Sequence, residues 1–195
     1  MRRAVKMLLN WLCVLLVFPA ALLAGFGRFK PGFDFFAQLF ALAPGIPGVL
    51  VRRAYYFLTL ESCSLECVLS FGVFCSRRST VIEHNVSLGP NIVIGRAHIG
   101  HHVLIGPNTQ LLSGRHHHIR DEDGSFTAPG ETSVKINIGP NAWIGASCVV
   151  MADVGEGTTI GAGSVVVDPI PAGVLAVGAP ARVIRELAPS DRKPN

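Results

Sequence analysis

The residues best suited to acid–base chemistry lie in one short part of the chain. All seven histidines fall between positions 84 and 118, and three of them are consecutive: His116, His117 and His118. Histidine is the side chain that most readily takes a proton near neutral pH. An acidic run follows within reach of a loop turn, Asp121, Glu122 and Asp123, and a carboxylate there could orient an imidazole. The pattern predicts a general base among the three histidines.

Two other interpretations of the histidines stay open, a surface run without a role and a metal site. Zinc takes histidine ligands, and the γ-carbonic anhydrases, which are solenoid enzymes, bind it between subunits through three of them. The sequence pattern of those enzymes looks like one histidine followed by another five positions later, and no pair of histidines in this chain has that spacing. We therefore expect His98, His101 and His102 to be outward-facing corner residues, and no metal ligands are assigned.

The element that must position these side chains is a repeat with a period of six. Apolar residues recur at this period, and most of them are followed by a small residue. They are Ile138, Ile144, Val150, Val154, Ile160 and Val166. The step from Val150 to Val154 is four residues, and the period of six resumes after it. An α-helix cannot use a period of six, and a strand can use it only if short straight segments meet at tight corners. The repeat predicts a β-solenoid with aliphatic side chains inside and small residues at the corners. A β-sandwich with coincidental spacing is the alternative.

The histidines lie at the root of a gap in this repeat. The repeat is clear from about Ile82 to Leu111, with one step of five between Ile94 and Ile99, and it resumes at Ile138. Residues 113–137 form a polar excursion. A long excursion from a rigid scaffold is a usual place for a functional site, and a disordered insertion is the other interpretation.

Two apolar stretches precede the repeat. Residues 7–26 are uncharged and could form a helix of about 30 Å, enough to cross the hydrocarbon core; a cleaved signal peptide is the rival interpretation. Residues 35–51 are interrupted by two Pro-Gly pairs, which favours a re-entrant or interfacial helix pair over an independent span. We expect a helical hairpin that dips into the membrane, and whether it crosses stays open.

Charge and cysteine content indicate the compartment. Basic residues flank both apolar stretches and predict a cytoplasmic side for both ends. These residues are Arg2, Arg3, Lys6, Arg52, Arg53, Arg77 and Arg78. Arg28 and Lys30, which lie between the two stretches, weaken the rule. Basic residues beside apolar stretches suit an anionic membrane surface and not nucleic acid. Five cysteines without a CxxC pair indicate reduced thiols in a cytosolic setting. We expect the cell inner membrane, with the solenoid facing the cytoplasm.

The chain is therefore expected to have three parts. Residues 1–60 form a helical membrane-anchoring region, residues 61–179 form the solenoid with its excursion at 113–137, and residues 180–195 form a C-terminal tail. The fold class is all-β with an N-terminal helical hairpin.

Two segments carry a family resemblance. NAWIGASCVV and GEGTTIGAGSVVVDPIPAGVLAVGAPARVIRE resemble the C-terminal signature of hexapeptide-repeat acyltransferases, which include the galactoside, maltose and xenobiotic acetyltransferases. The resemblance covers about residues 80–186. It implies a left-handed parallel β-helix, acetyl-CoA as cosubstrate without a required metal, and a homotrimer with active sites between subunits. The segment PGIPGVLVRRAYY is similar to that of membrane-linked members of surface-polysaccharide pathways.

The resemblance also implies roles for single residues. It places the general base at His116, with His118 and then His117 as the other candidates. Asp121 or Asp123 of the acidic run is the group that we expect to orient the imidazole. For the acyl-CoA it implies a channel residue, two corners whose backbone contacts the pantetheine arm, and two guanidinium groups near the phosphates. These are Trp143, Ala146, Ala162, Arg182 and Arg185. Val167–Asp168 replaces a Thr-Lys pair of the sugar acetyltransferases, which puts part of the phosphate contact in doubt.

The resemblance implies direct transfer of an acetyl group from acetyl-CoA to a hydroxyl, without a serine or cysteine nucleophile. With a membrane segment, the expected acceptor is a lipid-linked sugar or polysaccharide precursor at the cytoplasmic face. A soluble acetyltransferase acting on serine, a free sugar or a xenobiotic, a non-catalytic scaffold, and a zinc enzyme like the γ-carbonic anhydrases are the alternatives. The acceptor hydroxyl and the acyl chain length stay open.

Overall fold

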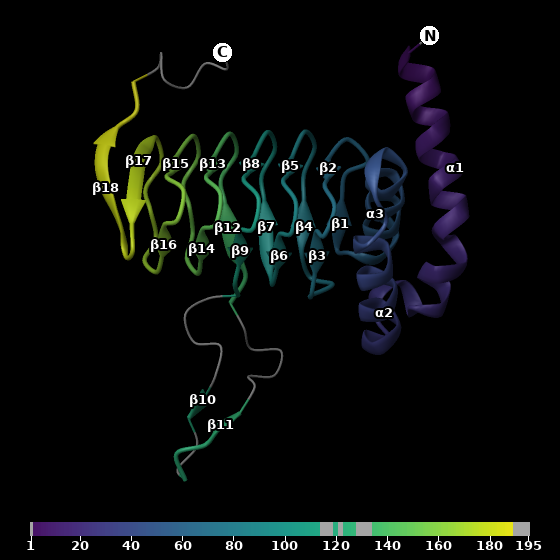
Figure 1. Ribbon diagram of the computed structural model, residues 1–195, viewed down its shortest axis with the longest axis horizontal. Coiled ribbons are helices and arrows are strands. Elements are labelled where there is room, and N and C mark those ends of the chain that lie inside the picture. Colours follow the sequence, from purple (N-terminus) through teal and green to yellow (C-terminus); the bar gives the residue numbers. More distant parts are fainter. Residues whose placement is uncertain (1, 114–118, 121–122, 128–133, 189–195) are drawn as a thin grey trace.

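The computed structural model describes residues 2–113, 119–120, 123–127 and 134–188. Three α-helices are followed by a solenoid of about five coils, and the helices stand at the end where the first coil begins (Figure 1). The helices are α1 (Arg2–Leu23), α2 (Lys30–Ala41) and α3 (Gly45–Thr59), with a short 3-10 helix, η1 (Gly25–Gly27), between the first two. The predicted β-solenoid is confirmed.

Three sheets run along the solenoid, and each complete coil contributes one short strand to each of them. Sheet A contains β1 (Ser62–Cys63), β4 (Val81–Ile82), β7 (Ala97–Ile99) and β12 (Ile136–Ile138). Sheet B contains β2 (Val68–Leu69), β5 (Ser87–Leu88), β8 (Leu104–Ile105), β13 (Trp143–Ile144), β15 (Thr159–Ile160), β17 (Val174–Gly178) and β18 (Ala181–Glu186). Sheet C contains β3 (Phe74–Cys75), β6 (Val93–Ile94), β9 (Gln110–Leu111), β14 (Val149–Val150) and β16 (Val165–Val166).

The periodic residues form the core of the solenoid. All six that define the repeat after the excursion are at most 2% exposed. Tight corners join the strands, and many corners contain one residue with positive φ directly before a buried residue. Asn85, Asn108 and Gly163 are examples. Asparagine and glycine adopt this conformation at little cost, so the small corner residues of the repeat have a direct structural reason.

The shortened step in the repeat corresponds to a trimmed coil. Val154 and Ile170 join sheet A only through isolated parallel bridges, so the last full strand of this sheet is β12. The step of four at Val154 in the sequence therefore marks a shortened coil. At the other end, the solenoid begins one coil before the clear repeat, with Cys63, Leu69 and Cys75 as its inward residues. Cysteine at two of these positions makes the aliphatic period of six less clear in the first coil than in the coils that follow.

The C-terminal end of the solenoid is closed by an antiparallel hairpin. Strand β18 pairs with β17, whereas the other strand pairs of sheets A, B and C are parallel. The segment expected as a tail after residue 180 therefore begins with a strand of sheet B.

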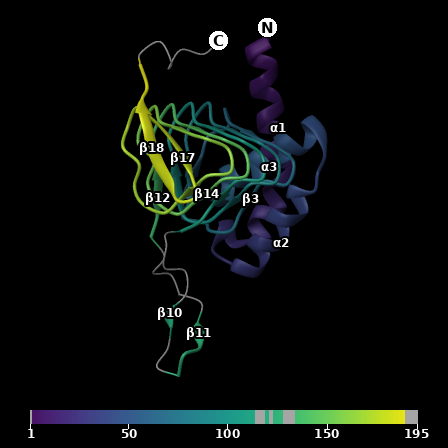
Figure 2. The same cartoon turned by 60° about the vertical axis from the view of Figure 1, so that its left-hand side comes forward.

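The excursion leaves the solenoid between sheets C and A. It departs after β9 and returns at β12, and its described part includes an antiparallel pair, β10 (Ile119–Arg120) with β11 (Phe126–Thr127). Figures 1 and 2 show this pair well away from the solenoid.

The two apolar stretches form three helices. The break predicted at the Pro-Gly pairs separates α2 from α3, since α2 ends at Ala41 and α3 begins at Gly45. Helix α3 packs on the first coil, where the backbone N–H of Cys75 donates a hydrogen bond to the Tyr56 hydroxyl at 2.9 Å. The helical region is therefore joined to the solenoid through a shared core.

The charge pattern used to orient the membrane stretches needs a correction. Arg52 is fully buried and Arg53 is 5% exposed. Arg52 donates hydrogen bonds to the carbonyls of Phe40, Ala41 and Ala43 around the end of α2, and to that of Leu69 in the first coil. Neither arginine can act as a surface charge, and their role is to join helices to solenoid.

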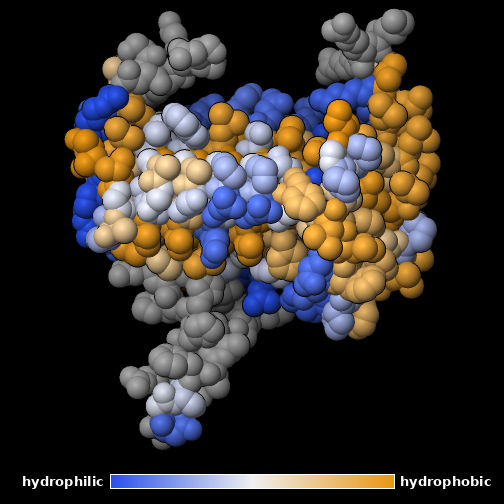
Figure 3. Space-filling view, viewed as in Figure 1, coloured by the Kyte–Doolittle hydropathy of each residue, from blue (hydrophilic) through white to orange (hydrophobic). Residues whose placement is uncertain are grey.

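Helix α1 combines a packed face with an apolar outer face. Val14, Val17 and Ala21 are buried, while Leu15 and Leu16 on the other side are 69% and 71% exposed. Figure 3 shows apolar residues gathered at this end of the molecule. Residues Ala4–Leu23 are long and apolar enough to cross a membrane, a test that a signal sequence near an N-terminus also passes.

Candidate functional site

The candidate acid–base residues belong to the excursion. His116, His117, His118 and Asp121 lie outside the residues that the structure describes. The root of the excursion is described: Ser113 is 3% exposed, and its hydroxyl accepts a hydrogen bond from the backbone N–H of Arg96 at 2.6 Å. This contact attaches the chain to the solenoid three residues before His116.

Asp123, the other candidate for orienting an imidazole, is described and has local partners. Its Oδ1 accepts hydrogen bonds from the backbone N–H and the hydroxyl of Ser125, at 2.9 and 2.7 Å. These bonds, that of the hydroxyl first, lower the pKa of the Asp123 carboxyl. The carboxylate therefore closes the turn between β10 and β11.

The expected acyl-CoA residues lie on the outer face of sheet B. Trp143 of β13 is 57% exposed and is paired with Thr159 of β15. Thr159 is in turn paired with Leu175 of β17, and Leu175 with Arg185 of β18. Adjacent strands are about 4.8 Å apart, so Trp143 and Arg185 are separated by about 14 Å across one row of the sheet.

A bulge in the terminal hairpin places both arginines on this face. Residues three apart in a regular strand point to opposite sides. In β18, however, Arg182 is paired with Val177 and Arg185 with Leu175, two partners that are only two residues apart. The register shift beside Ala176 accommodates the extra residue, as a β-bulge does. Arg182 and Arg185 therefore share the outer face with Trp143.

The corner between sheets B and C gives this face an edge of close-packed backbone. Ala146 and Ala162 occupy equivalent corners of adjacent coils, and the N–H of Gly163 donates to the carbonyl of Ala146 at 2.8 Å. A Cβ added to Gly145 would lie 2.5 Å from the Ala162 nitrogen, so only glycine fits there. Within the described part of the chain, the N–H groups of Ala146 and Ala162 donate no backbone hydrogen bond.

Asp168, which belongs to the Val167–Asp168 pair that differs from the sugar acetyltransferases, also lies near this face. An Asp168 carboxylate oxygen lies 3.9 Å from Nη1 of Arg182, and both side chains are more than half exposed. An acidic residue thus faces one of the two arginines at the position where the sugar acetyltransferases carry a lysine.

Cys148, the cysteine within the repeat, is a core residue. Cys148 is fully buried, and its thiol donates to the carbonyl of Gly161 at 3.2 Å. Burial raises the pKa of the Cys148 thiol, which disfavours the thiolate needed for nucleophilic attack. Cys148 therefore packs the corner beside Ala146 and is not a nucleophile.

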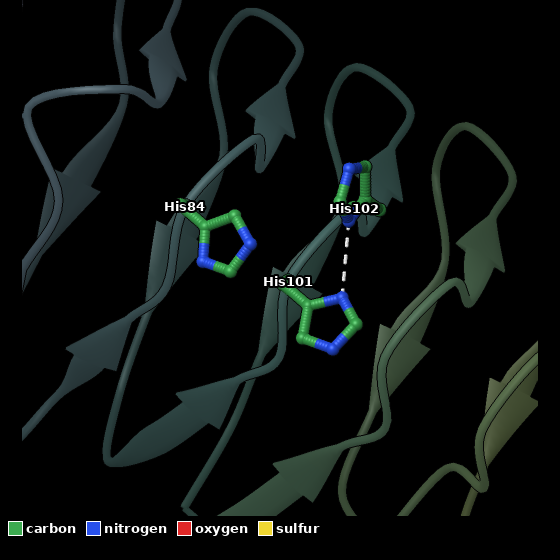
Figure 4. A group of neighbouring side chains, drawn as sticks. All are labelled: His84, His101 and His102. Atoms are coloured by element: carbon green, nitrogen blue, oxygen red, sulfur yellow. Dashed lines mark hydrogen bonds between the residues drawn. The ribbon is translucent and has the colours of Figure 1, made fainter.

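The structure assembles one group of side chains that sequence analysis missed. His84, His101 and His102 present ring nitrogens that all lie within 4.8 Å of one another (Figure 4). His101 and His102 are corner residues as expected, but His98 lies within strand β7, where Nε2 is 2.8 Å from a Glu83 carboxylate oxygen. The missed signal is the 17-residue spacing of His84 and His101, which equals the step from Ile82 to Ile99, one whole coil.

Comparisons with known proteins find acetyltransferases among the relatives of this chain. No family model matches the chain. Galactoside O-acetyltransferase of Escherichia coli K12 is 38% identical over an alignment of 126 residues that covers 54% of this chain and 59% of that protein. A provisionally named acetyltransferase of Saccharomyces cerevisiae is 31% identical over 139 residues, 68% of this chain and 69% of that protein. The chain spans about half the length of several curated relatives that it matches.

Solved structures show the same solenoid. A galactoside acetyltransferase in complex with coenzyme A superposes with a TM-score of 0.61 at 25% identity, over 85% of this chain and 86% of that one.

Proposed function

The chain belongs to the hexapeptide-repeat acetyltransferases, and we propose that it moves an acetyl group from acetyl-CoA to a hydroxyl group of a saccharide. The observation that carries the proposal is the common face of sheet B, on which Trp143, Arg182 and Arg185 lie together. The relative of similar architecture whose structure contains coenzyme A supports the choice of cosubstrate.

In this proposal the acyl-CoA runs along the corner between sheets B and C. The N–H groups at Ala146 and Ala162 donate to the carbonyls of the pantetheine arm, and Trp143 flanks the acyl channel. Arg182 and Arg185 bind the nucleotide phosphates, because two guanidinium groups on one face form strong charge-assisted hydrogen bonds with phosphate oxygens.

The chemistry is direct transfer. His116 takes the proton of the acceptor hydroxyl as its oxygen attacks the thioester carbonyl carbon, and Asp121 or Asp123 orients the imidazole. Backbone N–H groups at coil corners stabilise the resulting oxyanion. When the intermediate collapses, the C–S bond breaks and the imidazolium returns the proton to the CoA sulfur. His118 and His117 are the alternative bases.

The proposal includes a homotrimer. A single solenoid leaves its faces partly uncovered, which favours association. The excursion leaves each solenoid at the edge between sheets C and A and would reach the neighbouring subunit, so that His116 meets acetyl-CoA bound on the next chain. Three copies of the N-terminal helices would also strengthen membrane binding by avidity.

We further propose that the acceptor is a lipid-linked saccharide at the cytoplasmic face of the inner membrane. The support is the apolar outer face of α1, of which Leu15, Leu16 and Leu23 are each more than two-thirds exposed. The buried hydrogen bond from Arg53 to Asn10 holds α1 on α3, so a membrane-bound α1 would keep the solenoid close to the lipid surface.

The test uses the full chain in detergent micelles with labelled acetyl-CoA and two acceptors, a lipid-linked oligosaccharide and the same free saccharide. Label transfer that requires His116 and prefers the lipid-linked acceptor is expected. Equal transfer to both would favour a soluble sugar as substrate, the second candidate, which the galactoside in the name of the Escherichia coli relative supports. Full activity of His116→Ala would reject His116 as the base.

A further inference from the structure

We propose that His84, His101 and His102 form a binding site for a divalent late first-row transition metal ion, with zinc as the expected occupant. The site lies at the corner between sheets A and B, after β4 and β7. The excursion leaves the solenoid at a different edge, so this site is separate from the acid–base residues proposed for acetyl transfer.

The winding of the coils brings the three rings together. Ile82 is paired with Ile99 in sheet A, so that two positions further His84 and His101 occupy equivalent corners of adjacent coils. Their rings are stacked, with centroids 5.2 Å apart and planes inclined by 20°. His102 follows at the corner, and its ring lies 5.5 Å from that of His84. Figure 4 shows the three side chains together at this corner, where two adjacent coils contribute them.

The distances suit a small ion of tetrahedral preference. Zinc–nitrogen bonds of 2.0–2.1 Å place two ligand nitrogens about 3.4 Å apart. Nδ1 of His101 and Nδ1 of His102 are already 3.0 Å apart, and one ring nitrogen from each of the three histidines lies within 4.8 Å of the other two. Because His84 and His102 are exposed, small side-chain rotations would bring all three to bonding distance. The fourth position faces solvent and can hold water.

The amide of Asn85 lies beside the ring of His102. Its Nδ2 is 3.0 Å from Nε2 of His102, so Nε2 accepts this hydrogen bond and the ring proton is on Nδ1. Metal binding through Nδ1 requires the Asn85 amide to turn by 180°, so that its oxygen accepts from Nε2–H. A hydrogen bond from the second ring nitrogen then fixes the tautomer of a metal-bound histidine.

The backbone at His102 supplies a matched variant. Its φ is +58°, and the equivalent corners of the coils before and after carry Asn85 and Asn141 with φ of +57°. Asparagine therefore fits this corner, and His102→Asn removes one imidazole while it keeps the local conformation. His98→Gln is the control, since His98 binds Glu83 outside the cluster.

The experiment measures metal binding to the full chain without a polyhistidine tag. After chelator treatment, cobalt(II) is titrated as a spectroscopic probe, and zinc affinity is measured by competition with a coloured chelator. We expect one equivalent per chain with the visible absorption of tetrahedral cobalt, and at least a ten-fold weaker affinity in His101→Ala and in His102→Asn. His98→Gln and a variant with His116, His117 and His118 all replaced by alanine should keep the equivalent.

Zinc should also raise the Tm of the wild-type chain and not that of His102→Asn, because binding to the folded state alone stabilises it. The proposal is overturned if no equivalent binds, if binding survives unchanged in both cluster variants, or if it is lost only with the excursion histidines.

Discussion

Replacing Asp168 by asparagine should strengthen the binding of coenzyme A. The Asp168 carboxylate lies 3.9 Å from Nη1 of Arg182, the guanidinium that is proposed to bind the nucleotide phosphates. In Asp168→Asn the arginine no longer has to leave an ion pair when the phosphate arrives. The asparagine is close to aspartate in size, so the corner that carries it should keep its shape.

The geometry sets the size of the gain. At 3.9 Å two unit charges attract by about 1 kcal/mol in water and by about 4 kcal/mol at an effective dielectric constant of 20. The side chains of Arg182 and Asp168 are 63% and 52% exposed, which places the pair near the aqueous limit, and measured exposed pairs give about 0.2–1 kcal/mol. The dissociation constant should therefore fall by up to about five-fold.

Calorimetric titration with coenzyme A checks this value. The gain should shrink in an Arg182→Ala background, where the released cation is gone, and also at high salt. Glu156→Gln is a matched control, because Glu156 is an exposed acid at another corner. An unchanged or weaker affinity in Asp168→Asn would refute the reasoning. An equal gain without Arg182 would show that Asp168 acts on the phosphates directly.

Three further changes test the framework of the site. Arg52→Met should lower the free energy of unfolding in urea denaturation, because the carbonyls around the end of α2 lose their donor and a buried acceptor left unsatisfied costs about 1–3 kcal/mol. A loss within experimental error would contradict the proposed junction. Gly145→Ala should weaken coenzyme A binding at least ten-fold, since its Cβ would collide with the Ala162 backbone. Gly163→Asn should leave the binding unchanged, because Gly163 faces open space at φ +71° and asparagine tolerates this conformation. Cys148→Ala should keep the transfer rate in an acetyl-CoA turnover assay, because the thiol is buried and its pKa is raised; loss of activity in the folded variant would show a chemical role.

The core of the solenoid could be predicted because its information is local. A period of six can be recognised within a single coil, and the inward residues from Ile138 to Val166 are buried as the period requires. Even the trimmed coil follows from one short step at Val154. The first coil was less visible, because cysteines replace aliphatic residues at Cys63 and Cys75.

Features that depend on contacts between distant residues could not be predicted. The burial of Arg52 depends on carbonyls that only the packing of α2 and the first coil brings together, so the local charge pattern suggested a surface position. The common side of Arg182 and Arg185 requires a bulge that their spacing does not reveal. The histidine cluster depends on the length of a coil, 17 residues at that point, and not on the hexapeptide step.

The most direct test of the proposed function is mass spectrometry of a lipid-linked saccharide after incubation with isotope-labelled acetyl-CoA and the full chain. The account predicts one labelled acetyl group on the saccharide, released by mild alkali as an ester, and its loss in a variant with Arg182→Ala and Arg185→Ala. Coenzyme A binding without any labelled saccharide, across lipid-linked and free acceptors, would contradict acetyl transfer to a saccharide hydroxyl.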